Sequence, residues 1–241
     1  MEVPQRRRPE RTRRLPREVR ERQILDAAVR VFSAHGYHDA SMDEVSEVAG
    51  VSKPMIYAYL GSKEDLFGAC IRREATRLLE AVSGGIHGEL PPDMQLWHGL
   101  AAFFRFVGAH RESWRVLNRQ ASSHGGPFSA EVLDMRGRAI ALVDGLLVRA
   151  ATKRGLDEQA TRATEALAAA LVGSAESLAD WWLDHPDISD RTLASWLMNL
   201  VWMGFGDLVE GTVWVPAATA APGTASALGG AEGQAADELL L

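Results

Sequence analysis

Hydrophobic side chains recur at helical spacing along most of this chain of 241 residues. Ile24, Ala28, Val31 and Phe32 share one face of a first helix, which is expected to end near His35-Gly36 because glycine tolerates the backbone geometry of a helix terminus. No convincing run of alternating polar and apolar residues, the signature of a half-buried strand, is found. The pattern predicts an all-α fold of about nine helices.

Two short helices separated by a glycine are predicted next. Ser41 and Ser52 stand at N-cap positions, where a side-chain oxygen can accept a hydrogen bond from a free backbone N–H. Gly50 separates the two helices, and Pro54 fits the first turn of the second. Residues 41–60 therefore fit a helix-turn-helix, whose second helix can enter the major groove of DNA. Spacing alone leaves a plain helical bundle open, because any helical hairpin with a glycine corner looks similar.

A fourth helix is expected from Ser62, whose box-like start includes Asp65, to about Ser83. The glycines and prolines that follow, up to Pro92, predict a boundary between two regions. We expect a DNA-binding domain over 20–83.

A larger helical domain is expected over 90–214. It ends in two long helices, from about Asp157 to His185 and from about Ser189 to Gly211. Residues 215–241 are rich in Ala, Gly and Pro and are expected to form a disordered tail, because they lack the apolar periodicity that offsets ordering entropy.

Charge is distributed unevenly along the chain. Residues 1–22 hold nine arginines against four glutamates, whereas the chain as a whole has a net charge of −6. The arginines fall mainly in an expected flexible arm over 1–19, which could reach DNA phosphates. A solvated tail without a partner is the alternative that composition leaves open.

The residues expected to face DNA are those left outside once Ile56 and Leu60 point inward. Lys53 can donate to guanine, and Met55 can contact a thymine methyl group. Tyrosine hydroxyls and Lys63 suit phosphates. The predicted DNA-binding set is Ser41, Ser52, Lys53, Pro54, Met55, Tyr57, Ala58, Tyr59 and Lys63. Residues 41–60 carry one lysine against three carboxylates, so we hypothesise that Arg13, Arg14 and Arg17 of the arm supply further positive charge.

Residues 20–80 also carry a specific combination of residues. The segments are Ile24-Leu25-Asp26-Ala27-Ala28, Phe32, Gly36-Tyr37, Ser41-Met42, Val45 to Ala49, Gly50-Val51-Ser52-Lys53, Ile56-Tyr57, Tyr59 and Ser62-Lys63-Glu64-Asp65-Leu66. Together they resemble the opening of the tetracycline-repressor (TetR) family. Many members have Gly then Thr where this chain has Pro54 and Met55, and His or Trp in place of Ala58. These departures indicate an operator that cannot be inferred from relatives.

The resemblance implies a C-terminal domain that binds a small molecule and dimerises through its last two helices. Those helices are apolar around much of their circumference, and we expect Leu171, Leu178, Leu197, Val201 and Leu208 at the dimer interface. Packing inside one monomer is the alternative. The effector pocket is expected to be lined mainly by aromatic residues, although each of these can instead be ordinary core. The predicted pocket residues are Trp97, Phe103, Phe104, Trp114, Asn118, Met135, Trp181 and Trp182.

Other classes of function find little support in the sequence. No phosphate-binding glycine loop, cysteine pair or Gly-x-Ser-x-Gly motif is present, so no enzyme, metal or cofactor is predicted. The single cysteine, Cys70, is expected to be a buried hydrophobe, and no segment is apolar enough for a membrane span.

We expect a cytoplasmic homodimeric repressor that a small hydrophobic effector releases from double-stranded operator DNA. A helical adaptor without DNA is the remaining alternative.

Overall fold

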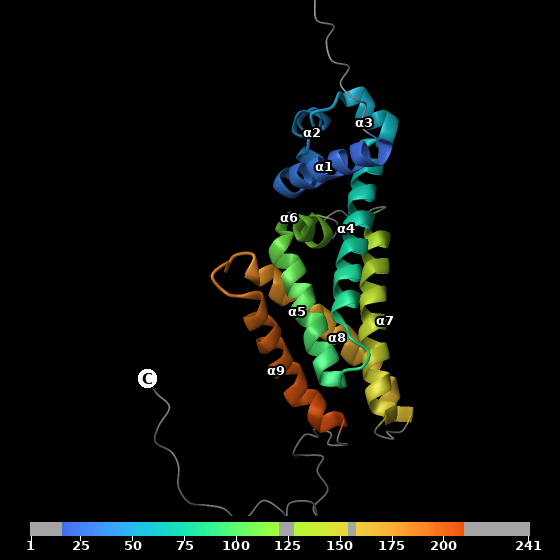
Figure 1. The fold of residues 1–241 in the computed structure, drawn as a ribbon, viewed down its shortest axis with the longest axis vertical. Helices are drawn as coiled ribbons and strands as arrows, with labels where there is room; N and C mark the ends of the chain where they lie inside the picture. Colours follow the sequence, from blue (N-terminus) through green and yellow to red (C-terminus); the bar gives the residue numbers. More distant parts are fainter. Residues whose placement is uncertain (1–15, 121–127, 154–157, 210–241) are drawn as a thin grey trace, which may run out of the picture.

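Every regular element in the computed structural model, which describes residues 16–120, 128–153 and 158–209, is helical (Figure 1). The elements are α1 (Arg17–Asp39), α2 (Met42–Ala49), α3 (Lys53–Leu60), α4 (Lys63–Gly85), α5 (Pro92–Ala109), α6 (Arg111–Trp114), the π-helical turn η1 (Arg115–Gln120), α7 (Ser129–Lys153), α8 (Glu158–Trp182) and α9 (Asp190–Val209). The predicted all-α fold is confirmed.

The first three helices form a unit at one end of the molecule. α1 packs against α2, α3 and α4, and its interior face consists of side chains such as Ile24, Ala28 and Phe32, each 0% exposed. A kink at Gly36, whose φ is 78°, interrupts α1 at the predicted position. The helix begins at Arg17, so the predicted arm over 1–19 overlaps its first turn.

Helix α4 connects this unit to the rest of the molecule. It begins under α1 and α3 and continues along α5 and α7, so its two halves lie in different parts of the hydrophobic core (Figure 1). Ser62 and Asp65 form the predicted capping box: the Ser62 hydroxyl accepts from the Asp65 N–H at 3.1 Å, and Asp65 Oδ2 accepts from the Ser62 N–H at 2.8 Å. These bonds fix the start of α4 directly behind α3.

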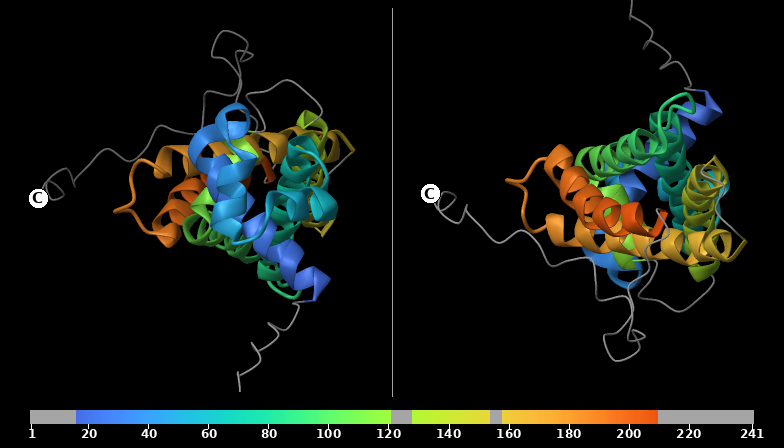
Figure 2. Two further views of the ribbon diagram at one scale, coloured as in Figure 1. Left: turned by 90° about the horizontal axis from the view of Figure 1, so that it is seen from above. Right: turned by 90° about the horizontal axis from the view of Figure 1, so that it is seen from below.

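The second region is a bundle of α4, α5, α7, α8 and α9. α7 runs beside α4 and packs against α8, while α9 packs mainly on α5 (Figure 1; Figure 2, view from below). α6 and η1 lie under α1, where Val116 and Leu117 of η1 are completely buried. The predicted helices after residue 90 are therefore present, although α8 ends at Trp182 instead of near His185.

Candidate DNA-binding surface and effector cavity

The turn between α2 and α3 is held by backbone and side-chain hydrogen bonds. Gly50 adopts the left-handed conformation with a φ of 62°, and the Val51 N–H donates to the Ser46 carbonyl at 3.1 Å. The Ser46 hydroxyl donates back to the Val51 carbonyl at 2.6 Å, and Gln23 of α1 donates to the Ala49 carbonyl at 2.6 Å. The turn is therefore fixed both internally and against α1, which gives α3 a defined direction.

The inward and outward faces of α3 follow the predicted division. Ile56 is 0% exposed, whereas Pro54, Tyr57 and Ala58 are exposed and Met55 and Tyr59 are half-buried. The Ser52 hydroxyl makes no capping hydrogen bond, contrary to expectation; its carbonyl accepts from the Met55 N–H at 2.9 Å instead. The exposed face leaves polar, aromatic and small side chains available to a partner.

Two lysines predicted to contact DNA are engaged within the protein. Lys53 Nζ lies 2.9 Å from Asp43 Oδ2, and this hydrogen bond raises the pKa of the lysine above its ordinary value. Lys63 Nζ donates to the His38 carbonyl at 2.9 Å and lies 5.1 Å from the centre of the Tyr37 ring. Lys63 thus braces the N-terminus of α4 against the end of α1.

Of the predicted arm residues, only Arg17 lies within the described part of the chain; Arg13 and Arg14 lie outside it. Arg17 is on the first turn of α1, where it forms an ion pair with Glu21 at 2.8 Å. Its guanidinium carbon is 5.4 Å from the centre of the Tyr59 ring of α3. The described chain therefore begins beside α3.

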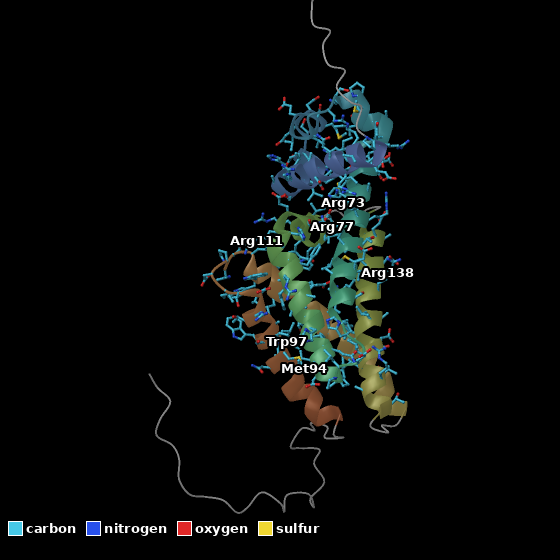
Figure 3. All side chains as sticks on the ribbon, viewed as in Figure 1. Arg73, Arg77, Met94, Trp97, Arg111 and Arg138 are labelled. Atoms are coloured by element: carbon cyan, nitrogen blue, oxygen red, sulfur yellow. The ribbon has the colours of Figure 1, made fainter. Side chains whose placement is uncertain are left out.

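A polar cluster joins α1 to α4 below this unit. Glu74 is 0% exposed, and its carboxylate lies 2.6 Å from Arg73 Nη2 and 2.9 Å from Arg77 Nη1. Arg73 also reaches Asp26 of α1 at 2.8 Å. Figure 3 shows Arg73 and Arg77 on α4 at the junction of the two regions. A buried carboxylate thus depends on two arginines of its own helix, one of which connects to α1.

An apolar cavity lies between α4, α5, α7 and α8. Its volume is about 80 Å³, and almost all of its wall is hydrocarbon. The wall consists of Leu78, Leu79, Val82, Ile86, Leu96, Gly99, Leu100, Phe103, Trp114, Met135, Arg136, Ala139, Leu142, Val143, Leu146, Leu171, Val172, Ala175 and Glu176. Because this volume is small, an apolar molecule fits only if the surrounding helices move slightly apart.

Three of the predicted pocket residues, Phe103, Trp114 and Met135, line this cavity, and the other five do not. Phe104 and Trp182 are core residues: their ring centres are 6.3 Å apart, and the Trp182 N–H donates to the Ile188 carbonyl at 2.8 Å. Most of the cavity wall is aliphatic, whereas the predicted pocket set is mainly aromatic.

The remaining three predicted pocket residues lie elsewhere. Trp97 packs edge-on against His98 near the start of α5 (Figure 3). Trp181 is 42% exposed and stacks on His185. Asn118 donates to Asp180 at 2.6 Å and, together with Trp181, borders a more open groove of about 870 Å³ between α8 and α9. The repeated apolar positions of α7 were the signal in the sequence that could have located the cavity.

The predicted dimer residues occupy different environments in the single chain. Leu171 lines the cavity, and Leu197 and Val201 are buried within the monomer, at 2% and 8% exposure. Leu178 is partly buried beside the groove, and the side chain of Leu208 lies outside the described residues. Among the described side chains of α8 and α9, the large apolar ones that are exposed are Trp181, Trp196 and Leu200, the last at 72%.

The single cysteine is buried as predicted. Cys70 is 0% exposed on the inner face of α4, and burial raises the pKa of its thiol to about 12. Among the described residues, no group of three potential metal-binding side chains comes together. No described helix has the length and apolar character needed to cross a bilayer.

Comparison with known proteins decides the family. Residues 24–70 match the family described as bacterial regulatory proteins, tetR family, and residues 92–204 match the tetracyclin repressor-like C-terminal domain. A TetR-like transcriptional regulator from Rhodococcus sp. RHA1, known from its crystal structure, is 42% identical, with a TM-score of 0.68 over 80% of this chain and 99% of that one. The chain belongs to the TetR family of DNA-binding transcriptional regulators.

Two further similar proteins are a transcriptional activator and a regulator that shares the fold. The transcriptional activator FasR of Mycolicibacterium smegmatis is 36% identical over 104 residues, which are 43% of this chain and 48% of that activator. The alignment thus spans about half of that relative. The regulator FadR from Bacillus subtilis, solved in complex with stearoyl-CoA, is 18% identical and has a TM-score of 0.66 over 75% of this chain and 96% of that one. At that identity it shows the shared fold alone.

Proposed function

We propose that this TetR-family chain is an effector-responsive homodimer, acting on DNA in the cytoplasm. The observation that carries the proposal is the double role of α4. Phe67 near its start is packed in the core of the helix-turn-helix unit, whereas Leu78 and Val82 line the apolar cavity. A molecule that enters the cavity touches the helix on which the DNA-binding unit is mounted. A change in the tilt of α4 then moves that unit as one body.

DNA reading is assigned to the outer face of α3. Lys53 and Tyr57 are the proposed base-reading residues, and Tyr59 and Lys63 the phosphate contacts, as the family resemblance implies. Lys53 has to exchange Asp43 for a base acceptor when DNA binds. Because that ion pair is exposed, breaking it costs little. Ser41, Ser52, Pro54, Met55 and Ala58 complete the proposed surface.

The arginines before α1 are proposed to add phosphate contacts. Arg17, on the first turn of α1, lies beside Tyr59, so the chain that precedes it starts next to the recognition helix. An arm over 1–19 that enters the adjacent minor groove would compensate for the acidic residues of α2. Deleting residues 1–15, which leaves α1 intact, should weaken operator binding and reduce its dependence on salt. Unchanged affinity and salt dependence would remove the arm from the proposal.

The effector is proposed to be a molecule with an apolar chain. The cavity wall is hydrocarbon along most of its length, and FadR from Bacillus subtilis, which shares the fold, was solved with stearoyl-CoA, whose acyl chain is a long hydrocarbon. Because the cavity is narrow, such a chain would separate α4, α7 and α8. The bound form would therefore favour a different tilt of α4, and its differential affinity for the two arrangements would release DNA.

A second copy of the chain is the proposed partner of the α8 and α9 surface. Trp181, Trp196 and Leu200 expose apolar area there, beside small residues of α8 such as Gly173 and Ser174 that permit close packing. A two-fold axis through this face would place two α3 helices in successive major grooves, about 34–36 Å apart. Leu200→Glu should shift sedimentation toward the monomer. The same change at Leu133, which is 65% exposed on α7, should leave the dimer intact; a dimer unaffected by Leu200→Glu would contradict this face.

Binding-site selection from random duplexes tests the DNA-binding part of the proposal. We expect the wild-type chain to select one two-fold symmetric sequence and to shift DNA that contains it. Lys53→Ala should relax the selected sequence, whereas Lys63→Ala should weaken binding to all duplexes alike. Arg138→Ala, on the surface of α7, is the matched control and should change neither (Figure 3). If no sequence is enriched, the adaptor alternative is favoured.

Release of the selected duplex tests the effector. Decan-1-ol and stearoyl-CoA, added separately, are apolar-chain probes, and at least one is expected to lower the DNA affinity. Repression stays a prediction, because the direction of regulation depends on where the operator lies relative to the promoter. A reporter gene controlled by the selected sequence measures that direction.

A further inference from the structure

The apolar cavity and the open groove between α8 and α9 share two charged residues. Arg136 of α7 and Glu176 of α8 border both spaces, and Arg136 Nη2 lies 3.3 Å from Glu176 Oε2. Gly173, one turn before Glu176, makes room for the guanidinium, since a Cβ there would lie 3.2 Å from Arg136 Nη2. This ion pair stands where a molecule inside the cavity would first meet polar groups.

The cavity has one apolar end and one charged end. Along α7 its wall runs from Met135 and Arg136 to Leu146, a distance of roughly 16 Å at the rise of an α-helix. Apart from Arg136 and Glu176, the side chains on the wall offer hydrocarbon or aromatic surface. An elongated molecule with its chain among the leucines therefore has its polar end at this ion pair.

The two residues of this ion pair differ in the free-energy cost of losing the partner. The Arg136 side chain is 44% exposed and can turn into the groove, where water solvates it. The Glu176 side chain is only 19% exposed, and burial raises the pKa of its carboxyl group, with a further contribution from Asp180 one turn away. Since an unpaired buried charge is costly, a ligand can replace the arginine far more easily than the glutamate.

The surroundings of Glu176 also favour positive charge. Asp180, which accepts from the Trp114 indole N–H at 3.0 Å, adds a second carboxylate. The rings of Trp114 and Phe103, with centres 5.3 Å apart, border the cavity, and aromatic faces attract cations. An anionic head would instead have to leave Glu176 unpaired beside Asp180.

We propose that the effector has an apolar chain and a cationic head, such as an amine or ammonium group, which displaces Arg136 and binds the Glu176 carboxylate. In the absence of the effector, the Arg136 guanidinium occupies the place of that head. The inference rests on the proposed effector cavity and specifies which chemical class that cavity selects.

Three probes with the same chain separate head charge from chain binding. Decylammonium, decan-1-ol and decanoate are titrated calorimetrically into the full-length protein below micelle-forming concentrations. We expect the ammonium compound to bind at least about tenfold more tightly than the other two, as expected for an interaction with a charged partner. If decanoate binds most tightly, the inference is wrong, and the polar head of the ligand binds Arg136 instead.

Variants of the pair have opposite expected effects. Glu176→Gln should remove the advantage of the ammonium probe, about tenfold, while leaving the decan-1-ol affinity within about twofold. Arg136→Gln should raise the affinity for the ammonium probe several-fold, because no intramolecular cation competes. Arg138→Gln, two residues further along α7 and paired with Asp134 on the outer surface, is the control for general charge and should change none of the affinities (Figure 3).

The outcomes distinguish this inference from the proposal on which it rests. If all three probes bind equally and neither substitution matters, the cationic head is wrong and the apolar effector cavity stands. If no probe binds, the cavity is not an effector site for such chains, and both ideas fall. If Glu176→Gln does not fold, Arg136→Gln still tests the inference. A reduced affinity of Arg136→Gln for the ammonium probe would contradict the displacement of Arg136 by the cationic head.

Discussion

The two halves of α4 lie in parts of the hydrophobic core that differ in construction. Around its first half, Phe67 contacts Phe32 edge-to-face with ring centres 4.8 Å apart, and both side chains are 0% exposed. Around its second half, Leu78 and Val82 border a cavity. The difference suits two tasks: the packed first half holds α3 in one orientation, and the second half leaves room for the proposed effector.

The dense core also extends beyond the helix-turn-helix unit. Phe128, which directly precedes α7, packs edge-to-face on Phe67 at 4.7 Å and contacts Tyr37 at 5.1 Å. α7 also carries much of the cavity wall, so one of its ends is anchored in the rigid region and the rest lies in the adaptable one. A shift of α7 caused by the proposed effector would therefore move Phe128 against Tyr37, whose ring Lys63 contacts.

The largest expected effect on stability comes from replacing a phenylalanine by alanine beside each half of α4. Phe67→Ala should lower the free energy of unfolding by about 4 kcal/mol, because it leaves a large hole in a fully packed core. Phe103→Ala should cost about 2 kcal/mol, since that ring is partly exposed and already borders empty space. Urea unfolding followed by circular dichroism measures both losses, and equal values would show that the two parts of the core do not differ.

The next effect concerns the buried carboxylate where the two regions meet. Glu74→Gln should cost about 3 kcal/mol, because Arg73 and Arg77 lose the buried charge with which both are paired. Glu80→Gln, on the exposed side of the same helix, is the matched control and should be close to neutral. A loss for Glu74→Gln no greater than that for Glu80→Gln would mean that the junction does not depend on this ion cluster.

Filling the cavity should have a smaller effect on stability and a large one on binding. Ala139→Leu places an isobutyl group in the cavity, so the free energy of unfolding should be unchanged or rise by about 1 kcal/mol. Calorimetric binding of the decyl probes should be lost, while DNA binding persists. Ala141→Leu, on the exposed face of α7, should leave probe binding as it is. Retained probe binding in Ala139→Leu would place the binding site elsewhere.

The smallest effect lies at the capping box of α4. Ser62→Ala should cost about 1 kcal/mol through loss of the cap. Hydrogen bonds from the Ser62 hydroxyl and backbone lower the pKa of Asp65, so its contribution is present above the ordinary pKa and is lost as the pH falls through the lowered value. The stability difference between the wild type and Asp65→Asn should therefore shrink below a pH of about 4. A difference independent of pH would contradict this interpretation.

The same comparison explains what the sequence could reveal. Gly36, Gly50 and the Ser62–Asp65 box act on neighbouring backbone groups, so local rules located each of them correctly. Trp181 and Trp182 are neighbours in the chain, yet the first is 42% exposed and the second 5%. Their different environments depend on packing between helices distant in sequence, which periodicity does not specify.

The predicted dimer face shows the same limit. α8 is apolar around much of its circumference, so the pattern could not tell the side of Leu171, which faces the cavity, from the side that faces outward. The charged end of the cavity was missed for a related reason: Arg136 and Glu176 are 40 positions apart and occupy ordinary surface-type sequence contexts. Only the pairing of α7 with α8 brings them together.

The buried thiol of Cys70 provides an internal reporter of motion. Because its pKa is raised to about 12, almost none of it is thiolate at neutral pH, and no reagent reaches it while α4 is packed against α1. The rate at which Cys70 is alkylated in the native protein therefore measures how often the core of the DNA-binding unit opens. Single cysteines introduced on α3 or α9 can be labelled with probes while Cys70 stays silent, so distances between the two copies of a dimer become measurable without removing a core side chain.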